Sequence, residues 1–122
     1  MRINRSYVTN FNSILSGDNI EFSSVSVSGN QTLTATDGFV TLLVNANSSA
    51  ITINLPTAVS NAAIFTIKKT DSSTNTVTID GSSSETIDGA ATIVLKDQYN
   101  YVQIVSDGTN WVIINEFINY IW

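Results

Sequence analysis

The chain has 122 residues, of which 43% are hydrophobic and 12% charged, with a net charge of −5 and neither cysteine nor histidine. This length predicts a single domain, and the high apolar content excludes a disordered protein. The missing residue types exclude disulfides, zinc–thiolate sites and imidazole catalysis, and five cations are too few for a nucleic-acid surface. No apolar run reaches the length of a membrane span. We therefore expect no cofactor, no nucleic acid and no membrane among its partners.

Residues 1–30 differ from the rest of the chain. They mix apolar and aromatic side chains irregularly with Asn and Ser, and they carry two of the five cations. We expect an N-terminal arm or accessory strand, in which residues 1–15 lie extended along a partner. Ile20–Ser28 either does the same or adds an edge strand to the main domain. The residues predicted to bind the partner are Arg2, Ile3, Arg5, Tyr7, Phe11, Ile14 and Leu15.

Strand patterns dominate residues 31–116. Short runs rich in Val, Ile, Thr and aromatics alternate with turn residues. Clean period-two alternation, as in Ile51–Leu55, is typical of a half-buried antiparallel sheet. Phe39–Val44 and Trp111–Ile114 are apolar on both faces, which predicts central or oligomer-covered strands. We expect an all-β domain, an antiparallel β-sandwich similar to a jelly roll. Its predicted strands are Thr32–Thr36, Phe39–Val44, Ala50–Leu55, Ile64–Thr70, Asn75–Ile79, Ala91–Lys96, Tyr101–Ser106 and Trp111–Asn115.

A four-residue motif, Thr-Ile-Asp-Gly, occurs twice, at Thr78–Gly81 and at Thr86–Gly89. Asp-Gly is a strong turn signal, because Gly accepts a positive φ and Asp tolerates one, so we interpret both copies as turns. A calcium site is the alternative, but the segment matches neither the EF-hand loop nor the glycine-rich nonapeptide of calcium-binding repeats. Its ligands would be Asp71, Asp80, Glu85 and Asp88.

Enzyme activity is not expected. A glycosidase would need two carboxylic acids across a cleft, and nearly all acids here lie in turns beside Gly or Ser. Tyr99, Tyr101 and Trp111 could form a sugar-stacking platform on a sheet face. We favour the simpler interpretation, in which Trp111 belongs to the core and the tyrosines cap a strand.

The last six residues, 117–122, are mostly large and apolar. Such a tail is expected to dock on its own sheet or on a neighbouring subunit, because exposure to water would promote aggregation. We therefore predict an oligomer interface that includes Phe117, Ile118, Tyr120, Ile121 and Trp122.

The order of motifs over residues 33–115 resembles a β-sandwich module of tailed-bacteriophage virion proteins, which include tail fibres, head fibres and capsid decoration proteins. The resemblance covers roughly two-thirds of the chain, involves framework residues, and brings no catalytic residue. It is carried by Leu33–Gly38, Ile51–Pro56, Phe65–Asp71, Asn75–Asp80, Glu85–Gly89 and Val105–Trp111.

The resemblance implies a virion structural protein. Tail fibres usually place such a module within a long chain, whereas here it is accompanied by a short arm and a short tail. We therefore expect a homotrimeric decoration (cement) or head-fibre protein, which binds the major capsid protein on the outer capsid surface and stabilises the shell. The leading alternative is a receptor- or glycan-binding tail-fibre or tip module, and a third is a bacterial surface or adhesin fragment with a similar sandwich.

Overall fold

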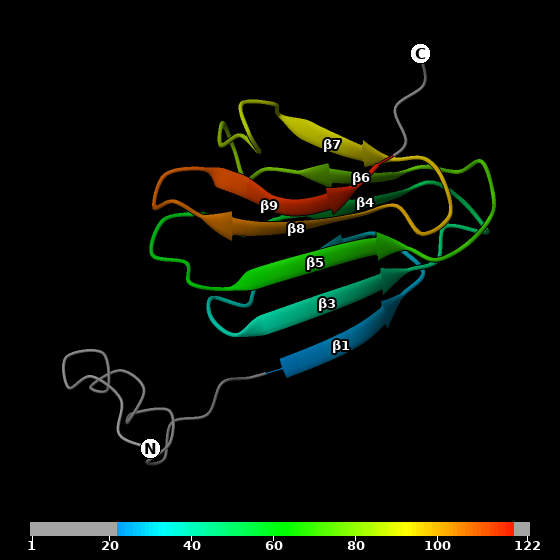
Figure 1. Cartoon of the computed structure of the whole chain (residues 1–122), viewed down its shortest axis with the longest axis horizontal. Coiled ribbons are helices and arrows are strands. Elements are labelled where there is room, and N and C mark those ends of the chain that lie inside the picture. The colour runs from blue at the N-terminus through cyan, green and yellow to red at the C-terminus, as the bar shows by residue number, and fades with distance from the viewer. Residues whose placement is uncertain (1–21, 119–122) are drawn as a thin grey trace.

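The computed structural model describes residues 22–118, which contain nine strands and no helix. They form two open sheets, one of five strands and one of four, so the predicted all-β class is confirmed (Figure 1). The strands are β1 (Phe22–Val27), β2 (Gln31–Thr32), β3 (Phe39–Val44), β4 (Ile51–Asn54), β5 (Ile64–Lys69), β6 (Val77–Asp80), β7 (Thr92–Leu95), β8 (Tyr101–Ser106) and β9 (Trp111–Phe117).

The chain alternates between the two sheets from β1 to β6. Over this stretch, β1, β3 and β5 enter the five-stranded sheet, whose full order is β1-β3-β5-β8-β9. The strands β2, β4 and β6 enter the four-stranded sheet, where β7 completes the order β2-β4-β6-β7. Each pair of strands thus forms one coil, and successive coils stack in parallel, β1 on β3 on β5 and β2 on β4 on β6. Antiparallel pairing begins only where β7, β8 and β9 join.

The prediction of antiparallel sheets is therefore wrong for the first six strands, because both sheets are mixed. A period of two reports only that one face of a strand is buried, and it is the same for parallel and antiparallel neighbours. The jelly-roll comparison assumed antiparallel neighbours and is not confirmed. Most strand positions are well predicted, and Phe39–Val44 and Tyr101–Ser106 coincide with β3 and β8. The prediction is wrong for Thr32–Thr36, of which only Thr32 lies in a strand, the two-residue β2.

Inward-facing side chains of both sheets form one buried cluster. Strand register stacks them in rows, so that Leu42, Ile67 and Val102 adjoin one another across β3, β5 and β8. Each of these three is at most 1% exposed. Such rows bury continuous apolar area, which is the main favourable term in folding.

Trp111 closes the core beside the second Thr-Ile-Asp-Gly motif. It is 1% exposed, its ring centroid lies 5.5 Å from that of Phe65, and its indole N–H donates to the carbonyl of Pro56 at 3.3 Å. This position confirms that Trp111 belongs to the core. However, β9, which it begins, is an edge strand rather than a central one.

The segment Phe22–Val27, part of the predicted arm, is the edge strand of the five-stranded sheet. It pairs with β3 in parallel over its whole length, from Phe22 opposite Phe39 to Val27 opposite Val44. Val25 faces inward with Leu42, yet it is 45% exposed, because no further strand of the described residues covers that end of the stack.

Candidate interaction surface

The outer face of the five-stranded sheet carries a continuous apolar column. Strand register aligns one outward-facing side chain from each of the five strands, and all of them are apolar. Phe22 and Phe39 are the most exposed members, at 64% and 37%, and their ring centroids lie 4.7 Å apart. The column consists of Phe22, Phe39, Ile64, Val105 and Val112.

A second column lies two residues farther along β1, β3 and β5 and contains only uncharged polar side chains. Two of its members bond each other, since the amide of Gln103 donates to the hydroxyl of Thr66 at 3.0 Å. The sheet face thus passes from an apolar margin to a polar, uncharged centre. The column consists of Ser24, Thr41, Thr66, Gln103 and Asn115.

Aromatic side chains gather at the opposite margin of the same face. The ammonium of Lys68 lies 5.3 Å from the ring centroid of Tyr99 and 5.8 Å from that of Tyr101, within the range of cation–π attraction. Tyr99 is 53% exposed and has a φ of 72°, which is uncommon for a bulky residue. The amide of Tyr99 donates to the carbonyl of Lys69, which holds this turn against β5.

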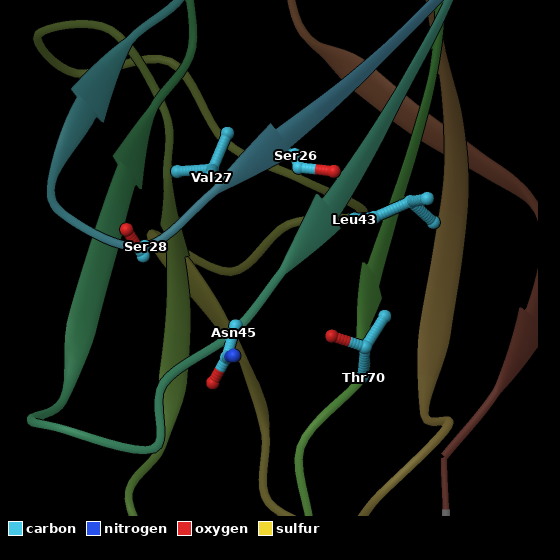
Figure 2. A pocket seen from close by; sticks show the side chains of 6 residues that line it. All are labelled: Ser26, Val27, Ser28, Leu43, Asn45 and Thr70. Atoms are coloured by element: carbon cyan, nitrogen blue, oxygen red, sulfur yellow. The ribbon is translucent and has the colours of Figure 1, made fainter.

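Figure 2 shows a shallow hollow near this margin, at the ends of β1, β3 and β5. Its volume is about 320 Å³, and four of the six residues that line it are polar and uncharged. Among the described residues, no charged side chain lines it, so it suits a neutral polar group better than an ion. The lining residues are Ser26, Val27, Ser28, Leu43, Asn45 and Thr70.

Two of the four acids proposed as calcium ligands, Glu85 and Asp88, bond to separate parts of the fold. The carboxylate of Glu85 accepts the hydroxyl of Thr57 at 2.7 Å and the amide of Ala58 at 2.8 Å. That of Asp88 accepts the amide of Ile113 at 3.0 Å. Within residues 22–118, no three acids cluster in a way that could hold a metal ion. The geometry therefore gives these carboxylates structural partners within the chain.

The glycine positions agree with turn chemistry at the second copy of the motif. Asp88 and Gly89 both have positive φ, 49° and 85°, and they connect Ile87 to Ala90 as a two-residue hairpin. Gly81 in the first copy serves a different purpose. A Cβ atom there would clash with the backbone oxygen of Glu85, so the close approach of the chain requires glycine.

Asp107 behaves as another turn residue. Its carboxylate accepts the amides of Asn110 at 2.8 Å and Thr109 at 2.9 Å, and these bonds lower its pKa. The exposed carboxylate thus stabilises the tight turn between β8 and β9.

A buried ion pair lies at the end of β5, and its carboxylate also bonds to the loop that follows β3. The ammonium of Lys69, which is fully buried, lies 2.6 Å from the carboxylate of Asp71 and also donates to the carbonyls of Asp71 and Ser73. Asp71 accepts the amides of Ala46 and Ser73 and the hydroxyl of Ser73. Burial alone would raise the pKa of Asp71, but the bonds from Lys69, Ser73 and the backbone outweigh it and hold the pKa well below its usual range.

The burial of Lys69 was not predicted from the sequence. A Lys-Lys pair at the end of a strand has the pattern of a solvated surface, but Lys69 lies in register with Val44 and faces inward. The one feature of the sequence that is consistent with a buried Lys69 is Asp71, two residues farther along the chain, because its carboxylate supplies the counter-charge.

Most residues predicted to make contacts lie outside the described range. This holds for Arg2, Ile3, Arg5, Tyr7, Phe11, Ile14, Leu15, Tyr120, Ile121 and Trp122. Phe117, the last residue of β9, is 49% exposed and pairs with Tyr101 on the outer face, whereas Ile118 packs partly against the core. The predicted oligomer interface thus includes one residue of the face described above.

Comparison with known proteins adds no family. No family model matches the chain, and no curated protein matches it. Residues 22–118 contain no helix that is long and apolar enough to cross a membrane.

Proposed function

We propose that this protein is a non-enzymatic structural protein of a tailed-bacteriophage virion, a homotrimer that binds the outer capsid surface as a decoration or head-fibre protein. Its two sheets would form a β-sandwich, with residues 1–15 as the arm that contacts the major capsid protein. The observation that carries the proposal is the outer face of the five-stranded sheet. A monomer that acts alone has no need of an apolar column across all five strands.

Binding alone would produce the function. A protein that straddles neighbouring capsid subunits buries apolar area there, and this area opposes the separation of those subunits. A standard interface buries about 1,600 Å² in total, and repetition over a symmetric shell multiplies its effect. The acids bonded within turns and loops, such as Glu85 and Asp88, support a role without catalysis.

A second candidate function is glycan binding, as expected of a tail-fibre tip. The cluster of Lys68, Tyr99 and Tyr101 favours it, because exposed tyrosine rings stack on sugars and the polar hollow lies on the same face. Trp111, the third member of the predicted sugar platform, is buried and cannot contribute.

Particle composition tests the first candidate against the second. Particles purified from a culture that carries the gene should contain hundreds of copies of this chain, measured by quantitative mass spectrometry of peptides. A few copies per particle, together with glycan-array binding that Tyr99→Ala abolishes, would favour the tip protein. Absence of the chain from particles would refute both.

The arm is tested by deletion. Removing residues 1–15 should leave the protein folded and assembled, yet abolish its binding to capsids that lack it. Full occupancy by the truncated protein would show that the folded domain provides the attachment.

A further inference from the structure

The apolar column runs along the stacking direction of the coils, not along the strands. Each of its five members comes from a different strand of one sheet, and neighbouring strands lie about 4.8 Å apart, so the column is about 19 Å long from its first member to its last. It is one residue wide and lies at a margin of the face, where β1, β3, β5 and β9 begin and β8 ends. A long, narrow stripe at a margin can lie against equivalent stripes around an axis parallel to it.

Charge distinguishes this face from the rest of the protein. The five strands of the sheet contain a single acid, Glu116, and register places it opposite the inward-facing Val102. The sole charge in the outward columns is that of Lys68. Because the whole chain carries a net charge of −5, most of its surfaces repel a second copy, whereas this face does not.

The outer face of the four-stranded sheet provides the contrast. Its outward positions hold mostly Thr, Asn and Asp, such as Thr52 and Thr78 in neighbouring strands and Asp80 at the end of β6. Val94, opposite Thr78, is an isolated apolar side chain there. One sheet therefore presents a polar face to solvent, while the other presents a continuous apolar column.

We propose that the apolar column is the contact between copies of this chain, which assemble side by side with their stacking directions parallel to a common threefold axis. Phe22 and Phe39 together expose about the area of one whole phenylalanine side chain, roughly 200 Å². Half-buried Ile64, Val105 and Val112 extend this area, and the polar column beside it forms a rim of hydroxyl and amide groups, as in protein interfaces generally.

The expected affinity follows from the size of the face. The outer face measures about 19 Å by 20 Å, an area that is smaller than the roughly 800 Å² that each partner contributes to a standard interface. Assembly through it should therefore depend on protein concentration in the micromolar range. This inference rests on the trimer of the proposed function and assigns its contact to a surface.

Two matched valine variants test the assignment. Val112 and Val94 are both half-buried, face outward and lie on edge strands, but only Val112 belongs to the column. Val112→Lys should weaken assembly at least about tenfold in sedimentation equilibrium, because a charge must lose its hydration in an apolar contact. Val94→Lys should assemble like the unmodified protein. Phe39→Ser, which adds no charge, should act like Val112→Lys.

Circular dichroism and a cooperative thermal unfolding transition establish that each variant is folded. Equal assembly of both valine variants would overturn the inference, as would an unmodified protein that is monomeric at micromolar concentration. A monomeric Val112→Lys that still binds capsids would support the interface and leave the capsid function intact. A trimer that is sensitive to Val112→Lys but absent from particles would support the interface and refute the function.

Discussion

Breaking the buried ion pair between Lys69 and Asp71 should destabilise the protein strongly, and substituting Asp71 should cost more than substituting Lys69. In Asp71→Asn, the buried ammonium of Lys69 would retain only neutral acceptors, chiefly the carbonyls of Asp71 and Ser73. Removing one partner of a buried pair typically costs about 3–5 kcal/mol. Because the total stability of a domain is about 5–15 kcal/mol, the loss should be a large fraction of it.

Lys69→Met should cost less. The carboxylate of Asp71 would still accept three hydrogen bonds, from the amides of Ala46 and Ser73 and from the hydroxyl of Ser73. The main loss is the charge-assisted hydrogen bond to Asp71, about 1.5–3 kcal/mol, together with the longer bonds to the carbonyls of Asp71 and Ser73, and the methionine retains the apolar stem. The double variant should cost less than the two single variants together, because neither charge remains unpaired.

Urea denaturation followed by circular dichroism measures all four proteins, at one protein concentration so that assembly contributes equally. The reasoning is refuted if Asp71→Asn lowers the free energy of unfolding by less than about 1 kcal/mol, well below the cost expected for a buried pair. It is also refuted if Lys69→Met is the more harmful change, or if the single effects are additive.

Three further predictions concern the acids and glycines. The pKa of Asp71 is lower in the folded protein than its ordinary value of 3.8. The ionised carboxylate therefore stabilises the fold above about pH 4, and this stabilisation is lost as the pH falls below that value. Urea midpoints that stay constant from pH 6 to pH 2 would contradict the prediction. In thermal unfolding, Gly81→Ala should lower the stability by about 1–3 kcal/mol, because the added Cβ clashes with the backbone of Glu85. Gly89→Ala should lower it by about 1 kcal/mol, because Gly89 has a positive φ although the space around it is open. Calcium should leave the melting temperature unchanged. Asp88→Asn should lower the stability only slightly, because the asparagine oxygen still accepts the amide of Ile113. A calcium-dependent rise in melting temperature that this variant removes would restore the metal hypothesis.

Strand positions could be predicted from the sequence because they depend on local composition and alternation. Ile51–Leu55 alternates between a buried and a half-buried face, as its pattern indicates. Strand direction could not be predicted, since it depends on which strands become neighbours. For the same reason, the apolar column could not be predicted from the sequence. Phe22 and Val112 are 90 positions apart in sequence, and only the register across three intervening strands aligns them.

One part of the candidate surface could nevertheless be predicted from the sequence. The apolar character of both faces in Phe39–Val44 suggested a strand covered on each side, and Phe39 is a member of the column. The positions of Lys68 and Lys69, in contrast, could not be predicted from the sequence pattern. Identical neighbours in sequence occupy opposite faces of one strand, and only the presence of Asp71 beneath the sheet makes burial of the second tolerable.

The alternation of strands between sheets implies an order in which the molecule opens. In a stack of coils, each strand is held mainly by its nearest neighbours, so protection against hydrogen exchange should vary along the stack. Within the described residues, β1 has one neighbour, whereas β5 lies between β3 and β8. Amide protons of β1 should therefore exchange first and those of β5 last. The apolar column spans this gradient, so contact between copies would slow exchange most at its Phe22 end, where the isolated chain is least protected.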